Sequence, residues 1–139
     1  MRIDGNEMVE YRIASSRHAP AEARRRLQQC LPATLPSERL QDAALAVSEL
    51  VSFGVREHLF PSYPDAGIVL RLGGRGGRVK VEIHGRPPAE RGWDSLEESL
   101  FEIVVLNAVT SGWGITADGM GVWFTIDRSS VAGRIEGAP

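Results

Sequence analysis

The side chains that most often carry chemistry are few in this chain and lie far apart. The histidines His18, His58 and His84 are well separated, and none is close to a cluster of cysteines or histidines. Zinc sites need such ligands at short spacing, so we expect no metal site. The glycine-rich run 73–77 lacks the Gly-Lys-Ser/Thr ending of a phosphate-binding loop, which indicates a turn. No local motif supports a Ser/His/Asp or Cys/His catalytic arrangement.

The tryptophans are a second group of candidates, because tryptophan is enriched among residues that dominate protein interfaces. We expect Trp113 and Trp123 to be core or rim residues. Trp93 lies in a loop rich in Gly, Pro and Arg, so it is the tryptophan best placed to contact a partner. A purely structural role for Trp93 stays open as well.

Apolar residues that recur every three or four positions predict the helices. The first covers 20–30, with a proline at its first position, where a missing N–H costs nothing. The second covers 37–58 and has the clearest pattern, so one of its faces should pack firmly against a sheet. The third begins at residue 94 or 95 and runs to about Thr110.

Alternating apolar residues predict strands within 8–15, 68–72, 78–83, near Ile115 and at 122–126. In the segment 78–83, one face is apolar and the other polar, which is typical of a half-buried strand. The glycine run joins the second and third strands as a hairpin. Strands that follow strands favour a mixed or antiparallel sheet. With about three helices on one face, the fold class is a two-layer α/β sandwich.

The chain has 139 residues, of which 42% are hydrophobic, and this suits one domain, residues 1–128. We expect residues 129–139 to form a flexible tail. The formal net charge of -2 gives no general attraction to nucleic acid or anionic lipid. A single cysteine, Cys30, indicates a reducing compartment and suits a small apolar helix position. Without a membrane-spanning run or a signal peptide, we expect a cytoplasmic protein.

Four short segments of the chain have a characteristic order and spacing: the helix segment Ala-Leu-Ala-Val-Ser-Glu-Leu-Val-Ser at 44–52, and the segments 78–83, 109–114 and 121–124. In this order they resemble the N-box, the adenine-side strand, the turn after the third helix and the last strand of the GHKL ATPase superfamily, specifically the bacterial anti-sigma-factor serine kinases. The resemblance covers about residues 10 to 128 and implies a Bergerat-type nucleotide-binding fold that forms a homodimer.

The N-box of the family has a Glu and, four residues later, an Asn that holds Mg²⁺. Here Glu49 matches the Glu, but Phe53 stands at the Asn position and offers no oxygen to the cation. Both side chains share one helix face. Glu49 is therefore either a relic of the family's base or an ordinary solvated residue. Phe53 either plugs the old cavity or belongs to a partner surface. Where the family has an Asp that reads adenine, this chain has Gly85.

The family's glycine-rich phosphate turn corresponds to residues 100–103, where neither glycine is present and a helix should continue instead. Glu102 would place a negative charge near the polyphosphate, at a cost of roughly 1–4 kcal/mol for like charges about 4 Å apart. Met120 and Gly121 replace the Lys/Thr pair that often begins the last strand. A pocket with this many losses is degenerate, and we expect no ATP or Mg²⁺ cofactor.

The resemblance then implies a regulatory protein-binding module, a pseudokinase that acts like an anti-sigma factor in transcription regulation. Its partner would be a sigma factor or an antagonist of the anti-sigma factor, and Arg24 and Arg25 on the first helix would help to bind it. The same arginines also suit an ordinary solvated helix face. The alternative is an active ATP-dependent serine kinase that uses Glu49 as its base. A third possibility is a different small ligand in the remodelled pocket.

Overall fold

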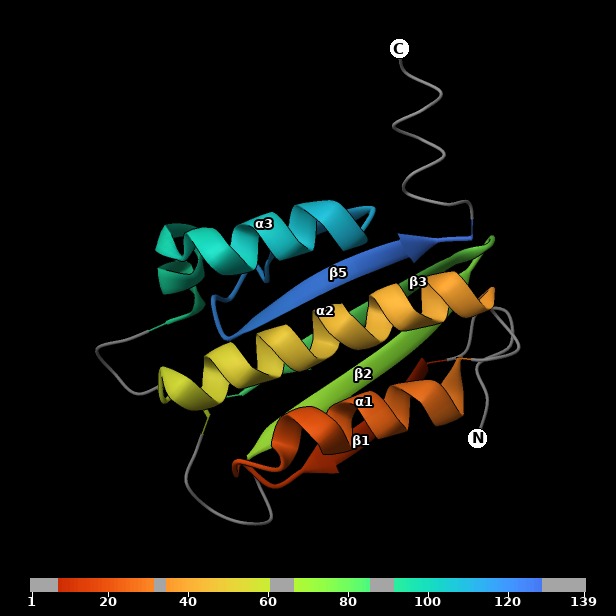
Figure 1. Ribbon diagram of the computed structural model, residues 1–139. Helices are drawn as coiled ribbons and strands as arrows, with labels where there is room; N and C mark the ends of the chain where they lie inside the picture. Colours follow the sequence, from red (N-terminus) through yellow and green to blue (C-terminus); the bar gives the residue numbers. More distant parts are fainter. Residues whose placement is uncertain (1–7, 32–34, 61–66, 86–91, 129–139) are drawn as a thin grey trace.

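The computed structural model describes residues 8–31, 35–60, 67–85 and 92–128. Within these ranges, the chain forms one sheet and one layer of helices (Figure 1). The expected C-terminal tail, 129–139, lies outside the described residues.

The five strands form a single antiparallel sheet in the order β1-β2-β3-β5-β4. Their bounds are Met8–Ile13 for β1, Ile68–Arg75 for β2, Arg78–His84 for β3, Gly112–Ile115 for β4 and Gly121–Asp127 for β5. The expected sheet is confirmed, and every neighbouring pair of strands within it is antiparallel.

The helices α1 (Ala19–Cys30), α2 (Ser37–Arg56) and α3 (Leu100–Val109) all lie on the same face of this sheet, and α2 runs between the other two (Figure 1). A short 3-10 helix, η1 (Trp93–Glu98), precedes α3. The two-layer sandwich predicted from the pattern of elements is therefore confirmed. None of the helices in the described part of the chain is long and apolar enough to cross a membrane.

The core lies between the helices and the inner face of the sheet. On β3, the side chains of Val79, Val81 and Ile83 are fully buried, as their alternation predicts. From the helix layer, Leu50 and other apolar residues of α2 are equally buried. Cys30 is also fully buried, at the end of α1, where the Tyr11 hydroxyl lies 3.9 Å from its sulfur. None of the described helices covers the opposite face of the sheet, which carries most of the charged strand residues.

The turn between β2 and β3 is shorter than the sequence suggests. The strand β2 extends to Arg75, so Gly73 and Gly74 pair with β3 and only Gly76 and Gly77 form the turn. Both turn glycines have positive φ, at 61° and 80°. This backbone matches the type I′ hairpin turn, which twists in the same sense as the strands.

The prediction of one continuous helix from residue 94 or 95 to about 110 is wrong. Ser99 is extended, with φ of −99° and ψ of 92°, and it separates η1 from α3. The expectation that 100–103 is helical is met, but this segment starts a helix instead of continuing one. Ser99 and Glu102 have the Ser-x-x-Glu spacing typical of a helix N-terminus, but Ser99 makes no side-chain hydrogen bond to the helix backbone, and its hydroxyl donates to the Glu102 carboxylate instead.

Candidate functional site

Three aromatic side chains meet at the C-terminal end of α2, and we call Phe53, Phe60 and Trp93 the aromatic cluster. The Trp93 ring centroid lies 6.1 Å from that of Phe53 and 5.6 Å from that of Phe60, the latter edge-on. The three residues are 3%, 6% and 0% exposed. These distances are typical of favourable aromatic pairs, so the cluster is a compact part of the core.

Two glycines allow the aromatic cluster to pack so closely. A Cβ atom on Gly54 of α2 would lie 2.4 Å from Phe60 Cε2 and 2.9 Å from Trp93 Cη2. A Cβ atom on Gly85, which directly follows β3, would lie 2.3 Å from Phe60 Cδ1 and 3.3 Å from the carbonyl oxygen of Gly67. Phe60 therefore occupies the space between the end of α2 and the end of β3, and any side chain at residue 85 would displace it.

Gly85 and Gly121, two of the predicted pocket residues, lie close together at the β3–β5 end of the sheet. Gly121 pairs with His84, and the Gly85 N–H donates to the carbonyl oxygen of Met120 at 3.1 Å. Glu49 lies one turn before Phe53 on α2 and is half-buried. The structure thus brings Gly54, which follows Phe53 on α2, and Gly85 to the two sides of the Phe60 ring.

Glu102 is almost fully buried in the first turn of α3, at 4% exposed. The Ser99 hydroxyl donates to its carboxylate, and an Arg56 guanidinium nitrogen lies 3.4 Å from it. Arg56 also lies over the Phe53 ring, 5.5 Å from the centroid. The carboxylate is therefore held by a cation and a hydroxyl of this chain, and it ties the start of α3 to the end of α2.

Trp93 was predicted to be a candidate for partner contact, and its full burial contradicts this role in the conformation described. Its surroundings are the other two rings and the backbone of Gly54. The indole N–H has no hydrogen-bond acceptor within the described residues, a loss that typically costs about 1–3 kcal/mol. Phe53 is also a core residue here, which leaves its ring no surface for a partner.

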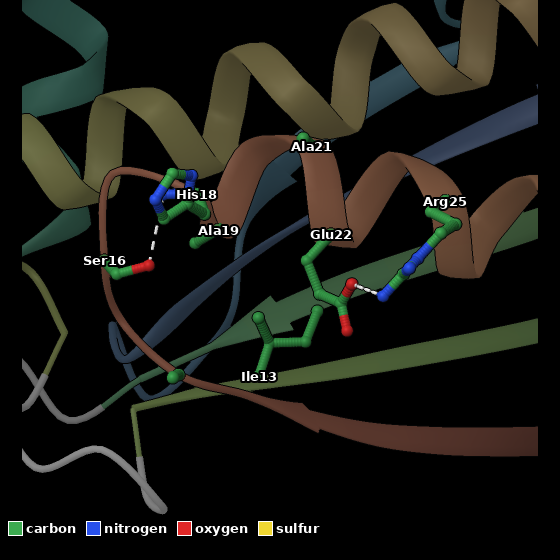
Figure 2. Close-up of a pocket in the computed structure, with 8 residues that line it drawn as sticks. Ile13, Ser16, His18, Ala19, Ala21, Glu22 and Arg25 are labelled. Carbon is green, nitrogen blue, oxygen red and sulfur yellow. Dashed lines mark hydrogen bonds and ion pairs between the residues drawn. The ribbon is translucent and has the colours of Figure 1, made fainter.

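Arg24 and Arg25 are exposed on α1, so they remain available for contact with a partner. Arg25 pairs with Glu22 in the preceding turn of the helix. Figure 2 shows this pair on the rim of a shallow depression between the end of β1 and the start of α1. His18 also lines the depression, and its backbone N–H donates to the Ser16 hydroxyl at 3.1 Å.

A second depression lies on the uncovered face of the sheet. His84 Nε2 is 2.8 Å from a carboxylate oxygen of Glu82, and Lys80 Nζ is 3.3 Å from the other. Burial alone would raise the pKa of Glu82, but hydrogen bonds and charges from these two neighbours outweigh it and lower the pKa. The Lys80 ammonium lies 5.5 Å from the Trp123 ring centroid. The charged side chains in this depression are therefore paired with one another. His84 lies on the outer face of the sheet, as the alternation of side chains along the strand predicts.

The described residues contain no group of three or more His, Cys, Asp or Glu side chains placed to hold a metal ion. A comparison of the chain with protein-family models and with curated proteins finds no match to either.

Sequence reasoning missed Phe60 and Arg56, although both help to build this region. Phe60 follows the predicted end of the second helix and precedes a proline, so it belongs to no helical or strand-like pattern of apolar residues. The signal that could have found it is the apolar pair Leu59 and Phe60 directly after the helix, since two large apolar residues in a loop need burial. Arg56 gives no such signal, because exposed arginines are common on helices.

Proposed function

We propose that this chain is a regulatory protein-binding module of the anti-sigma-factor type, in which side chains of the protein itself close the nucleotide pocket. The observation that carries the proposal is the aromatic cluster, which fills the space between α2 and Gly85. In the GHKL proteins that the sequence resembles, the positions of Phe53 and Gly85 hold the side chains that contact Mg²⁺ and adenine.

Steric arguments support the loss of nucleotide binding. A single methyl group at residue 85 would already approach the Phe60 ring to 2.3 Å. An adenine ring seated beside Gly85 would need Phe60 to leave its place. Trp93 packs against the far edge of Phe60, so this movement would open the aromatic cluster and expose apolar rings to water.

Electrostatic arguments agree with the steric ones. The phosphates of a nucleotide need free backbone N–H groups at a helix N-terminus. At the start of α3, the carboxylate of Glu102 already occupies the first turn and pairs with Arg56. A polyphosphate would meet this carboxylate and would have to compete with it for the arginine.

The proposal includes a protein partner, either a sigma factor or an antagonist of the anti-sigma factor, and a cytoplasmic homodimer that acts without ATP. Arg24 and Arg25 are exposed on α1 and suit such a contact. The five antiparallel strands under one helix layer agree with the architecture expected for this family.

Isothermal titration of the full chain with Mg·ATP tests the proposal. We expect no heat of binding for the natural protein. The variant Phe60→Ala, which removes the ring between α2 and Gly85, serves as a comparison, because it shows whether the ring alone blocks the pocket. Micromolar affinity of the natural chain for Mg·ATP would overturn the proposal. Transfer of labelled phosphate to an antagonist protein, lost in Glu49→Gln, would establish the serine kinase instead.

A further inference from the structure

Helix α3 presents large apolar side chains to solvent. Leu100 is 75% exposed, Phe101 65% and Val104 59%. We call these three residues the α3 surface. Single exposed apolar residues are common, but neighbouring ones on one helix face are a sign of an interaction site.

The fold does not need these side chains for its own packing. Glu102 and Leu106, four residues apart, are the buried residues of α3, and Val109 packs against the same core. The α3 surface lies on the other side of the helix, because at 3.6 residues per turn residues 100, 101 and 104 point roughly opposite to the buried positions. Figure 1 shows that α3 lies at one side of the helix layer, with α2 as its neighbour on one side only.

Acidic residues lie directly beside the α3 surface. Asp94, Glu97 and Glu98 are all exposed on η1, which leads into α3. Arg56 at the end of α2, which reaches the first turn of α3, is already paired with Glu102 at 3.4 Å and with Glu57 at 3.8 Å. Within the described residues 92–103, every charged side chain is acidic, so the apolar side chains of α3 have negative charge beside them at the N-terminal end of the helix.

We infer that the α3 surface binds an amphipathic segment of a protein partner, with apolar residues on one face and Lys or Arg beside them. The inference rests on the proposed function, since it names the surface through which the module holds its partner. The apolar side chains supply the buried area, and the acids of η1 select a basic segment and reject an acidic one.

The size of the α3 surface argues for such a segment and against a second copy of the chain. A helix of ten residues is about 15 Å long. A stable protein–protein interface needs about 800 Å² from each partner, more than three side chains can supply. Laying one amphipathic helix against such a surface is a common mode of recognition. An anionic membrane is disfavoured, because Glu97 and Glu98 would face its negative charge.

The test uses the full chain and a synthetic amphipathic helix of about 14 residues, with leucines on one face and lysines on the other. Fluorescence anisotropy gives its affinity, and amide chemical shifts locate its contact. We expect shifts concentrated on 94–108. We expect Phe101→Ser to weaken binding at least about tenfold and Glu97→Lys with Glu98→Lys to weaken it severalfold. Leu45→Ser changes a 43%-exposed apolar residue of α2 and is the matched control, expected to leave the affinity unchanged.

Several results would overturn the inference. If a peptide with glutamates in place of the lysines binds equally well, the acids of η1 do not select a basic segment. Shifts away from α3, or equal losses in Leu45→Ser and Phe101→Ser, would show non-specific adhesion. Sedimentation that reveals a dimer abolished by Phe101→Ser would assign the surface to a second copy, and binding to phosphatidylglycerol vesicles lost in the same variant would assign it to a membrane. The nucleotide titration is independent of all these measurements, so failure of this surface and failure of the proposed function can be told apart.

Discussion

The aromatic cluster and the α3 surface contain the same kinds of side chains in opposite situations. Phe53 on α2 is 3% exposed, whereas Phe101 on α3 is 65% exposed. The two helices are nevertheless neighbours in the helix layer (Figure 1). Trp93 is covered because α2, the segment after it and η1 all supply groups that surround the ring. Phe101 projects from a single helix, and no described helix or strand lies beyond it on that side (Figure 1).

This contrast separates a closed apolar region from an open one. A ligand can enter the aromatic cluster only by displacing side chains that stabilise the fold. A partner can cover the α3 surface without disturbing any contact that the structure makes. The comparison therefore indicates that the α3 surface binds the partner and that the aromatic cluster stabilises the fold. Substitutions can test each of these two claims.

The largest effect is expected for Trp93→Ala. Removing a fully buried indole leaves a cavity between Phe53, Phe60 and Gly54, and large-to-small changes of this kind cost about 3–5 kcal/mol. The free energy of unfolding, measured by urea denaturation, should fall by that amount, unless the unpartnered indole N–H offsets part of it. Because a typical domain has only about 5–15 kcal/mol in total, the variant should be near its stability limit.

The matched control for this loss is Trp123→Ala on the uncovered face of the sheet. Trp123 is only half-buried, and it contributes a cation–π contact with Lys80 and packing over Gly114. Its removal should cost about 1 kcal/mol or less. If both substitutions destabilise the protein equally, the aromatic cluster is not the special stabilising region that we describe.

A smaller loss is expected for Gly85→Ala, which adds the methyl group that would meet Phe60 Cδ1 at 2.3 Å. Overpacking of this kind costs about 1–3 kcal/mol. Gly112→Ala is the matched control, because its Cβ atom would find no neighbour closer than 3.6 Å. A double-mutant cycle with Phe60→Leu should recover part of the loss, since the smaller side chain leaves room for the methyl group. Additive effects would contradict the contact between residues 60 and 85.

Much of the fold follows from local patterns in the sequence. The spacing of apolar residues located α1 and α2, because a helix that packs one face on a sheet must repeat every three or four residues, while α3 is only part of the longer third helix that was predicted. The alternation in β3 gave the correct inner and outer faces, down to the outward position of His84. The helix break at Ser99 was missed, because no glycine or proline separates η1 from α3 and both segments are helical.

The candidate site was harder to predict, because it depends on contacts between distant segments. Nothing near Trp93 in the sequence shows that Phe53 and Phe60 will surround it, so its burial could not be inferred from the glycine-rich loop. The sequence did identify Gly85 and Phe53 as the positions that depart from the resembled family. It could not show that Phe60, from a third segment, fills the space between Gly85 and Gly54, the neighbour of Phe53.

The smallest effect on stability, and the sharpest test of the open region, is expected for Phe101→Ser. The ring is 65% exposed and the helix is held by Leu106 and Glu102 on its other side, so the free energy of unfolding should change by no more than about 0.5 kcal/mol. Urea denaturation of this variant beside Phe53→Ala, expected to lose about 3–5 kcal/mol, compares one residue type in both regions. A large loss for Phe101→Ser would mean that its ring already packs within the protein or against a second copy, and that the α3 surface is not open. A negligible loss would show that this exposed apolar area does not stabilise the fold, which the inferred binding role requires.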